Sequence, residues 1–163
     1  MPIFGSVAAR QPIEGMKNTK QIFHVLSYIQ YPLMLVVLYF YIQVLISTGT
    51  GETDWSALNN ALIFLGIQVG FSTLQDTSKV QNKVSRIVWE SPRKGKITIG
   101  VITALVILFL ISGLIGFFSS RDTIHKEISF GLIVLGIGLI GMLKGAIEMF
   151  ENHRKDRKIT QDS

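Results

Sequence analysis

Cysteine is absent from the 163-residue sequence, and Asp, Glu, Lys and Arg together make up only 17% of it. An average soluble domain has about 25% charged residues. Without cysteine the chain can form no disulfide framework, thiolate metal site, thiol nucleophile or cysteine-linked lipid anchor. The charges are also unevenly placed, and four segments contain none: 21–51, 55–75, 97–120 and 128–143. This division is typical of a chain that lies partly in water and partly in lipid.

The lack of charge inside these segments excludes two classes of membrane protein. Proton-coupled pumps and small multidrug exporters bind their coupling ion at a carboxylate near the bilayer midplane, and voltage sensors carry repeated arginines in one span. The first charge inside any expected span is Lys144, near the inner end of the last one. We therefore expect neither a proton-coupled transporter nor a voltage sensor.

Residues for catalysis and cofactor binding are also missing. His24, His125 and His153 each lack a second histidine at i+3 or i+4, so we expect no metal or haem site. The sequence has no nucleophile elbow, phosphate loop or paired carboxylate, so we expect no enzyme activity and no cofactor. Residues 136–141 match G-x-G-x-x-G, but a dinucleotide site needs this motif after a strand, and here it lies inside an apolar run.

Four helices are predicted to cross a membrane. Crossing about 30 Å of hydrocarbon takes about 20 residues at about 1.5 Å each. We place the spans of an all-α membrane protein at about 28–46, 55–74, 97–118 and 128–149. The competing interpretation is a soluble helical bundle, whose helices would place polar residues at every third or fourth position. Residues 105–111 instead read Leu-Val-Ile-Leu-Phe-Leu-Ile.

The chain is predicted to have three parts. Residues 1–20 contain two prolines and two glycines and are expected to form a flexible cytoplasmic arm. A transmembrane bundle over 21–149 and a cytoplasmic helical tail over 150–163 follow. The first helix is expected to begin near Gln21, to bend at Pro32 and to serve as an uncleaved insertion signal.

Basic residues indicate how the spans are oriented. Fourteen of the 16 lysines and arginines lie in the arm, in the loop between the second and third spans, or around the end of the fourth span. The positive-inside rule therefore places both termini in the cytoplasm, and we predict a multi-pass protein of the cell membrane, the bacterial inner membrane in particular. This orientation also explains the net charge of +5, so we expect no nucleic-acid partner.

The cytoplasmic connector 76–96 has the pattern of an amphipathic helix. Val80, Val84 and Ile87 recur at helical spacing, while basic residues occupy another face. The connector is either a solvated helix or one that lies on anionic lipid or docks a partner. The candidate contacts to anionic lipid are Lys79, Lys83, Arg86, Arg93, Lys94 and Lys96.

Neutral polar residues gather in the second predicted span. One face, at about 100° per residue, holds Asn59, Gly66, Gly70 and Thr73. Gln68 and Gln75 lie on nearly the opposite face, so this helix is expected to sit centrally. In the first span one stripe holds Tyr28, Pro32, Tyr39 and Gln43. Such groups either bond one helix to another or line a narrow neutral pore. The candidate pore or polar network consists of Gln43, Asn59, Gln68 and Gln75.

Glycines form a stripe along the fourth predicted span. Gly131, Gly138, Gly141 and Gly145 lie within about 80° on a helical wheel. A groove of this kind lets another backbone approach closely, so it is a candidate helix-packing surface, either within the bundle or between copies of the chain.

Two functions from different classes remain. The first is a non-enzymatic membrane protein that acts through helix–helix association, as an accessory or assembly subunit or as a self-associating effector. Its partners would be the lipid bilayer and either copies of itself or other membrane subunits. The alternative is an oligomeric channel for ions or small solutes, with the second span lining the pore. A carrier for a neutral solute is a weaker third option.

Overall fold

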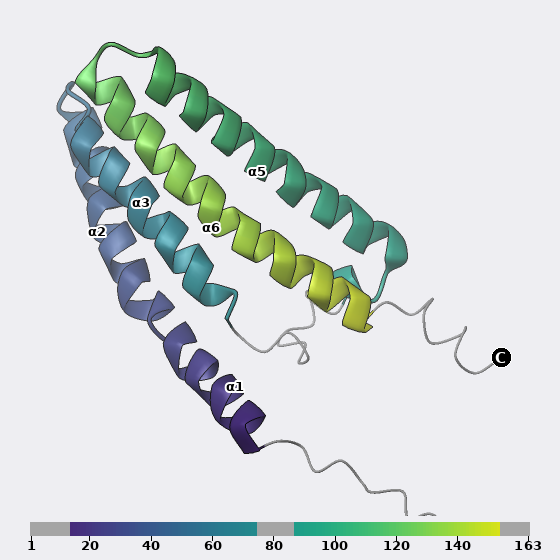
Figure 1. Cartoon of the computed structure of the whole chain (residues 1–163). Helices are drawn as coiled ribbons and strands as arrows, with labels where there is room; N and C mark the ends of the chain where they lie inside the picture. The colour runs from purple at the N-terminus through teal and green to yellow at the C-terminus, as the bar shows by residue number, and fades with distance from the viewer. Residues whose placement is uncertain (1–13, 75–86, 154–163) are drawn as a thin grey trace, which may run out of the picture.

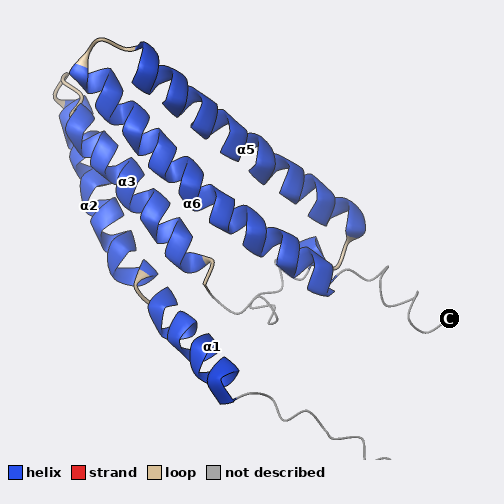
Figure 2. Ribbon diagram, in the orientation of Figure 1, coloured by secondary structure: helices blue, strands red, loops and turns tan. Residues whose placement is uncertain are grey.

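A computed structural model describes residues 14–74 and 87–153 of the protein. Within these residues the chain is helical, with short turns and no strand (Figure 2). The helices are α1 (Glu14–Ser27), α2 (Gln30–Gly49), α3 (Trp55–Ser72), α5 (Pro92–Ser119) and α6 (Thr123–His153). The all-α class predicted from the sequence is confirmed for the part of the chain that is described.

The long helices pack side by side in the order α2, α3, α6, α5 (Figure 1). The hairpins α2–α3 and α5–α6 are each antiparallel, and they meet along α3 and α6, which run in the same direction. The turns of both hairpins lie at one end of the row, the upper left in Figure 1. α3 therefore has α2 on one side and α6 on the other, in agreement with the central position predicted from its two polar faces.

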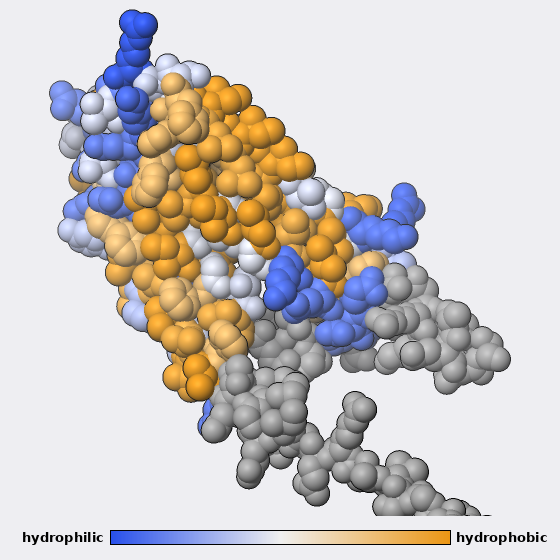
Figure 3. Space-filling model, viewed as in Figure 1, coloured by the Kyte–Doolittle hydropathy of each residue, from blue (hydrophilic) through white to orange (hydrophobic). Residues whose placement is uncertain are grey.

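Among the described residues, three stretches are long and apolar enough to cross a membrane: Gln21–Gly49, Pro92–Ser119 and Thr123–His153. The sequence predicted four, and the missing one is α3. This helix has only 18 residues, among which two asparagines and a glutamine lower the mean hydropathy. On the face seen in Figure 3, hydrophobic residues cover the middle of the helices and hydrophilic residues gather toward the two ends, as expected of a protein that spans a bilayer.

The first helical stretch begins earlier than predicted and is interrupted at Tyr28 and Ile29. α1 starts at Glu14, inside the segment 1–20 for which a flexible arm was expected. Because Pro32 has no N–H to donate to the Tyr28 carbonyl oxygen, the Tyr31 N–H bonds to that oxygen instead, at 3.1 Å. The Ile29 N–H likewise bonds to the Leu26 carbonyl oxygen at 3.1 Å. The predicted bend is present, and it lies one turn before the proline.

Aspartates cap two of the helices at the hairpin turns. Asp54 precedes α3, and its Oδ1 accepts a hydrogen bond from the Ala57 N–H at 2.9 Å. The Ser47 hydroxyl at the end of α2 accepts the Asp54 N–H at 3.0 Å, which ties the two ends of the turn together. Gly51 within this turn has φ 98°, a left-handed conformation that favours glycine. Asp122 occupies the same position before α6.

The buried core is small and lies between α5 and α6. Its buried members are Ile102, Val106, Leu135, Leu139 and Ala146, and leucines and a valine of α3 pack against them. Most large apolar side chains of α2 and α5 are exposed on the surface of the row. In a membrane that surface faces lipid, so apolar packing in the core contributes less to the association of helices than close backbone contact and hydrogen bonds.

Candidate functional site

The glycine stripe of α6 lies against α3. Gly66 and Gly138 face each other at the centre of this contact, where a Cβ atom on Gly66 would lie 2.6 Å from the Val134 carbonyl oxygen and 2.8 Å from the Leu135 Cα. A Cβ on Gly138 would clash with the Gly66 carbonyl oxygen. Glycine at both positions therefore lets two parallel helices approach at backbone distance.

The other stripe residues meet α3 above and below this point, with one exception. A Cβ on Gly131 would lie 2.6 Å from Asn59 Oδ1, and a Cβ on Gly141 would lie 3.1 Å from the Thr73 hydroxyl. Gly145 has no atom of the described residues within 4 Å of the position of its Cβ. Of the two alternatives left open by the sequence, packing within the bundle therefore describes Gly131, Gly138 and Gly141, whereas no described residue packs on Gly145.

The structure contains a second close contact that the sequence analysis missed. Gly113 and Gly116 of α5 face Ser129 and Ile133 of α6, and a Cβ on Gly113 would lie 2.9 Å from the Ser129 carbonyl oxygen. The signal in the sequence is a pair of glycines at i, i+3 inside an apolar helix, together with a buried serine on the partner. Small residues therefore line both sides of α6, which explains how one helix packs closely against two neighbours.

Many hydroxyl groups in or at the ends of the helices are hydrogen-bonded within their own helix. Among the described residues, eight donate to a carbonyl oxygen three or four residues earlier, at 2.6 to 3.0 Å. These residues are Ser27, Ser47, Thr48, Thr50, Ser72, Thr73, Thr103 and Ser129. In lipid such a bond satisfies the hydroxyl donor without a second helix, so these hydroxyl groups do not need a hydrogen bond to another helix.

The amide groups of α2 and α3, unlike these hydroxyl groups, have few hydrogen-bond partners among the described residues. Gln43 of α2 donates one hydrogen bond from Nε2 to the Tyr39 hydroxyl at 2.7 Å, on an exposed flank of the helix. Asn59 Oδ1 is buried against Gly131 and has no hydrogen-bond donor among the described residues. Asn60 and Gln68 are half-buried and make no hydrogen bond to any described residue. The α2–α3 hairpin therefore holds several amides that this part of the chain does not satisfy.

The predicted polar network is not assembled as one unit. No hydrogen bond joins Gln43, Asn59 or Gln68 to one another, and Gln75 lies outside the described residues. The structure brings Asn59 against the glycine stripe and Gln43 against Tyr39. Tyr39 was noted in the sequence only as a member of the stripe on the first span, and its hydrogen bond identifies it as the partner of Gln43.

The basic residues of the predicted lipid contact are described only in part. Lys79, Lys83 and Arg86 lie outside the described residues. Arg93, Lys94 and Lys96 are exposed in the first turns of α5, where Pro92 begins the helix and Gly95 is covered by the Phe150 ring of α6. Phe150, which packs on Gly95, lies near the end of α6. The three basic residues beside Gly95 therefore lie at the end of the row opposite the hairpin turns.

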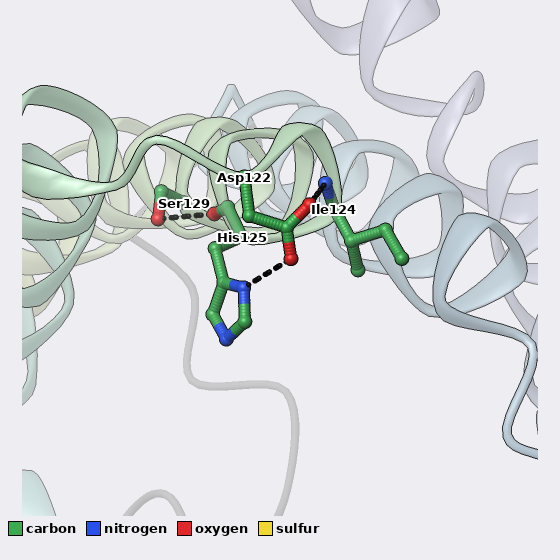
Figure 4. Close-up of polar contacts among 4 residues, drawn as sticks. All are labelled: Asp122, Ile124, His125 and Ser129. Atoms are coloured by element: carbon green, nitrogen blue, oxygen red, sulfur yellow. Dashed lines mark hydrogen bonds and ion pairs between the residues drawn. The ribbon is translucent and has the colours of Figure 1, made fainter.

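A small polar cluster stands at the start of α6 (Figure 4). The Ile124 N–H donates to Asp122 Oδ1 at 3.3 Å, and His125 Nδ1 donates to Asp122 Oδ2 at 2.9 Å. These bonds, the one from His125 first, hold the pKa of Asp122 below its ordinary value. One turn later the Ser129 hydroxyl donates to the His125 carbonyl oxygen at 2.6 Å. Asp122 and His125 are exposed and cap the helix, whereas Ser129 is buried. In the described residues no group of three metal-ligating side chains occurs.

Comparison with known proteins gives no match of any kind: no family model, no curated protein and no solved structure matches the chain.

Proposed function

We propose that the chain is a small membrane protein that acts without catalysis, by association of its helices with other membrane-embedded helices. The observation that carries the proposal is the presence on α2 and α3 of amides whose hydrogen bonds the described residues do not complete. In hydrocarbon an amide without a hydrogen-bond partner is costly, and an interhelical hydrogen bond from such a group is worth roughly 0.6 to 2 kcal/mol. A partner helix that completes these bonds is favoured over lipid.

The membrane topology that we propose has four crossings, with α3 as the fourth. α3 lies between α2 and α6, so its neighbours shield part of its polar surface from lipid. An even number of crossings also puts both ends of the chain on one side, which is the side that fourteen lysines and arginines favour. The proposed location is accordingly the cell membrane, with the bacterial inner membrane as the compartment and both termini in the cytoplasm.

The test of association is purification of the full chain from its own membrane in mild detergent. The particle mass and the identity of copurifying chains are then measured. We expect a particle larger than one chain with its bound detergent, made of copies of the protein, other membrane subunits or both. A monodisperse single chain without companions, recovered across several mild detergents, contradicts the proposal.

An oligomeric channel is the alternative function, and Gln68 is the residue that favours it. Gln68 is half-buried on α3 and makes no hydrogen bond to a described residue, so it could contact a permeating solute in an assembly of several copies. In reconstituted bilayers, conductance that changes in the Gln68→Leu variant supports a channel. Silence over a range of ions and voltages supports association without conduction.

A further inference from the structure

The membrane amides are confined to one of the two hairpins. Residues 92–119 and 123–149, which make up α5 and most of α6, contain no asparagine or glutamine, whereas α2 and α3 together contain Gln30, Gln43, Asn59, Asn60 and Gln68. α3 has a helix on each side, so part of its polar surface is covered by α2 and α6. α2 stands at the edge of the row and has no buried residue. A polar group on α2 is therefore the most accessible to a helix from outside the chain.

Gln43 is that group. Its Nε2 donates to the Tyr39 hydroxyl at 2.7 Å, and the amide makes no other hydrogen bond to a described residue. Among the described residues, the amide oxygen and the second N–H of Nε2 therefore have no partner. Tyr39 and Gln43 lie within the apolar stretch Gln21–Gly49 and within the expected span 28–46, where lipid tails offer no hydrogen-bond partner for these groups.

The Tyr39–Gln43 pair places an amide on one flank of α2, whereas the exposed Tyr41 places only a hydroxyl on another side. Exposed apolar side chains surround the part of α2 that α3 does not cover. The distribution of apolar surface therefore does not indicate which face of α2 would bind another helix. Leu35, Tyr39, Gln43 and Ile46 lie within about 80° on a helical wheel, and we call them the amide flank. Consecutive members of the amide flank are four, four and three residues apart. Such spacing is typical of the face with which one helix packs against a second, nearly parallel helix.

We infer that the amide flank binds the same flank of a second copy of the chain. This inference rests on the proposed function, because it names the partner in the helix association. Two copies in one membrane have the same orientation, so a two-fold axis along the membrane normal brings each residue opposite itself at equal depth. An amide carries both a donor and an acceptor, so Gln43 of one copy can bond to Gln43 of the other. The flank has no charge that would oppose this arrangement or require a charged partner.

Cysteine cross-linking tests the contact directly, because the natural chain has no cysteine. Leu35→Cys and Ile46→Cys place one thiol on the flank near either end. Met34→Cys and Leu45→Cys are the matched controls, at almost the same depth but turned about 100° away. All four positions are well exposed in one chain: 64% for Leu35, 64% for Ile46, 51% for Met34 and 56% for Leu45.

Each full-length variant is reconstituted in lipid vesicles at low protein density and treated with a mild oxidant. We expect disulfide-linked dimers from Leu35→Cys and Ile46→Cys and little or none from Met34→Cys and Leu45→Cys. Equal cross-linking at flank and control positions, or none at the flank, overturns the inference. Because these are single substitutions of exposed side chains, failure to fold is not expected to obscure the result.

A second measurement tests the role of the amide. Energy transfer between labelled copies in vesicles, followed on lipid dilution, gives the dissociation constant of the pair. Gln43→Leu removes the hydrogen bonds and keeps the bulk of the side chain, and we expect it to weaken self-association about threefold to twentyfold. Met34→Leu introduces a leucine at a control position outside the amide flank and is expected to leave the dissociation constant unchanged. An unaltered constant for Gln43→Leu overturns the inference.

The two proposals fail in different ways. If the chain copurifies with a different membrane protein while Leu35→Cys and Ile46→Cys do not cross-link, the amide flank does not bind a second copy and the association function stands. If neither a copy nor another chain is bound under any mild condition, both fail.

Discussion

Gly66 of α3 and Gly138 of α6 touch backbone to backbone, and neither position has room for a Cβ atom. The contact joins the two hairpins of the row, since α3 belongs to one and α6 to the other. In a membrane the hydrophobic effect does not hold helices together, so a contact of this closeness is a main source of stability for the fold.

Gly138→Leu is therefore expected to destabilise the protein. A leucine side chain must push α3 and α6 apart, which costs about 1–3 kcal/mol in a packed interior. Gly145→Leu is the matched control on the same stripe, because nothing lies within 4 Å of its Cβ position. Thermal unfolding in one mild detergent measures both. Equal loss of stability at the two positions would show that the observed packing of α3 on α6 is wrong.

How far the sequence anticipated this contact can be seen from the same residues. A helical wheel placed Gly131, Gly138 and Gly141 on one face of α6 and Asn59, Gly66 and Thr73 on one face of α3, but it could not show that these two faces meet. A wheel gives directions around one helix and carries no information on its neighbour. Gly145 differs from the other stripe residues because α3 ends at Ser72, one turn short of its level.

Other features were beyond the reach of composition and periodicity. The 18 residues of α3 contain enough amide side chains to keep it from being among the stretches that are long and apolar enough to cross a membrane, although its neighbours shield part of that polar surface. Hydropathy treats each residue as if it were in contact with lipid. It therefore underestimates the tendency to span a membrane of a helix that lies between two others. The contact of Ser129 with Gly113 and Gly116 also needed coordinates, since it depends on how α5 and α6 are rotated toward each other.

Asp54→Ala is expected to loosen the turn between α2 and α3. The substitution removes the acceptor of the Ala57 N–H, and loss of such a cap costs about 1 kcal/mol. Asp54→Asn keeps an oxygen at the same place and serves as the control. Hydrogen exchange of amides in the first turn of α3 reports the effect locally. Equal protection in the alanine and asparagine variants would contradict a capping role.

Acid is expected to weaken the start of α6 through Asp122. Its pKa is lowered in the folded protein, chiefly by the hydrogen bond from His125, so the ionised form is favoured by folding. The stabilisation is fully present above the pKa of an unfolded aspartate, about 3.9, and is lost as the pH falls through the lower folded value.

The Asp122→Asn variant isolates this contribution. Asparagine does not titrate, so the natural chain should be the more stable of the two at neutral pH, and the difference should shrink as the pH falls below about 4. Thermal unfolding of both proteins over this pH range, in one detergent, measures it. A difference that stays constant with pH contradicts the role assigned to the Asp122 carboxylate.

The exposed basic turn of α5 gives a prediction about lipid. Replacing Arg93, Lys94 and Lys96 together by glutamine is expected to reduce binding of anionic lipid, at about 1 kcal/mol per basic residue near the surface. Native mass spectrometry, or exchange of a fluorescent anionic lipid, compares the variant with the natural chain. The control exchanges Arg121 and Lys126 for glutamine at the opposite end of the row. Equal retention of anionic lipid by both variants contradicts the proposed lipid contact.

Whether α3 crosses the membrane decides the topology, and single cysteines in the cysteine-free chain can decide it. With four crossings, Glu52 and Arg121 lie on one side, and Lys94 and Asn152 lie on the other. With only three crossings, the order after α3 is inverted, so that Lys94 and Asn152 join Glu52 and Arg121 changes side. All four side chains are exposed and lie in the turns or at helix ends.

We expect a membrane-impermeant maleimide to label Glu52→Cys and Arg121→Cys on intact cells, and Lys94→Cys and Asn152→Cys only after permeabilisation. This pattern follows from the row itself, because both hairpin turns lie at one end, and the Phe150 ring of α6 covers Gly95 of α5 at the other. Labelling of Lys94→Cys from outside together with protection of Arg121→Cys would show that α3 does not cross. The parallel packing of α3 and α6 could then not form in a bilayer, because the two helices would lie at different depths.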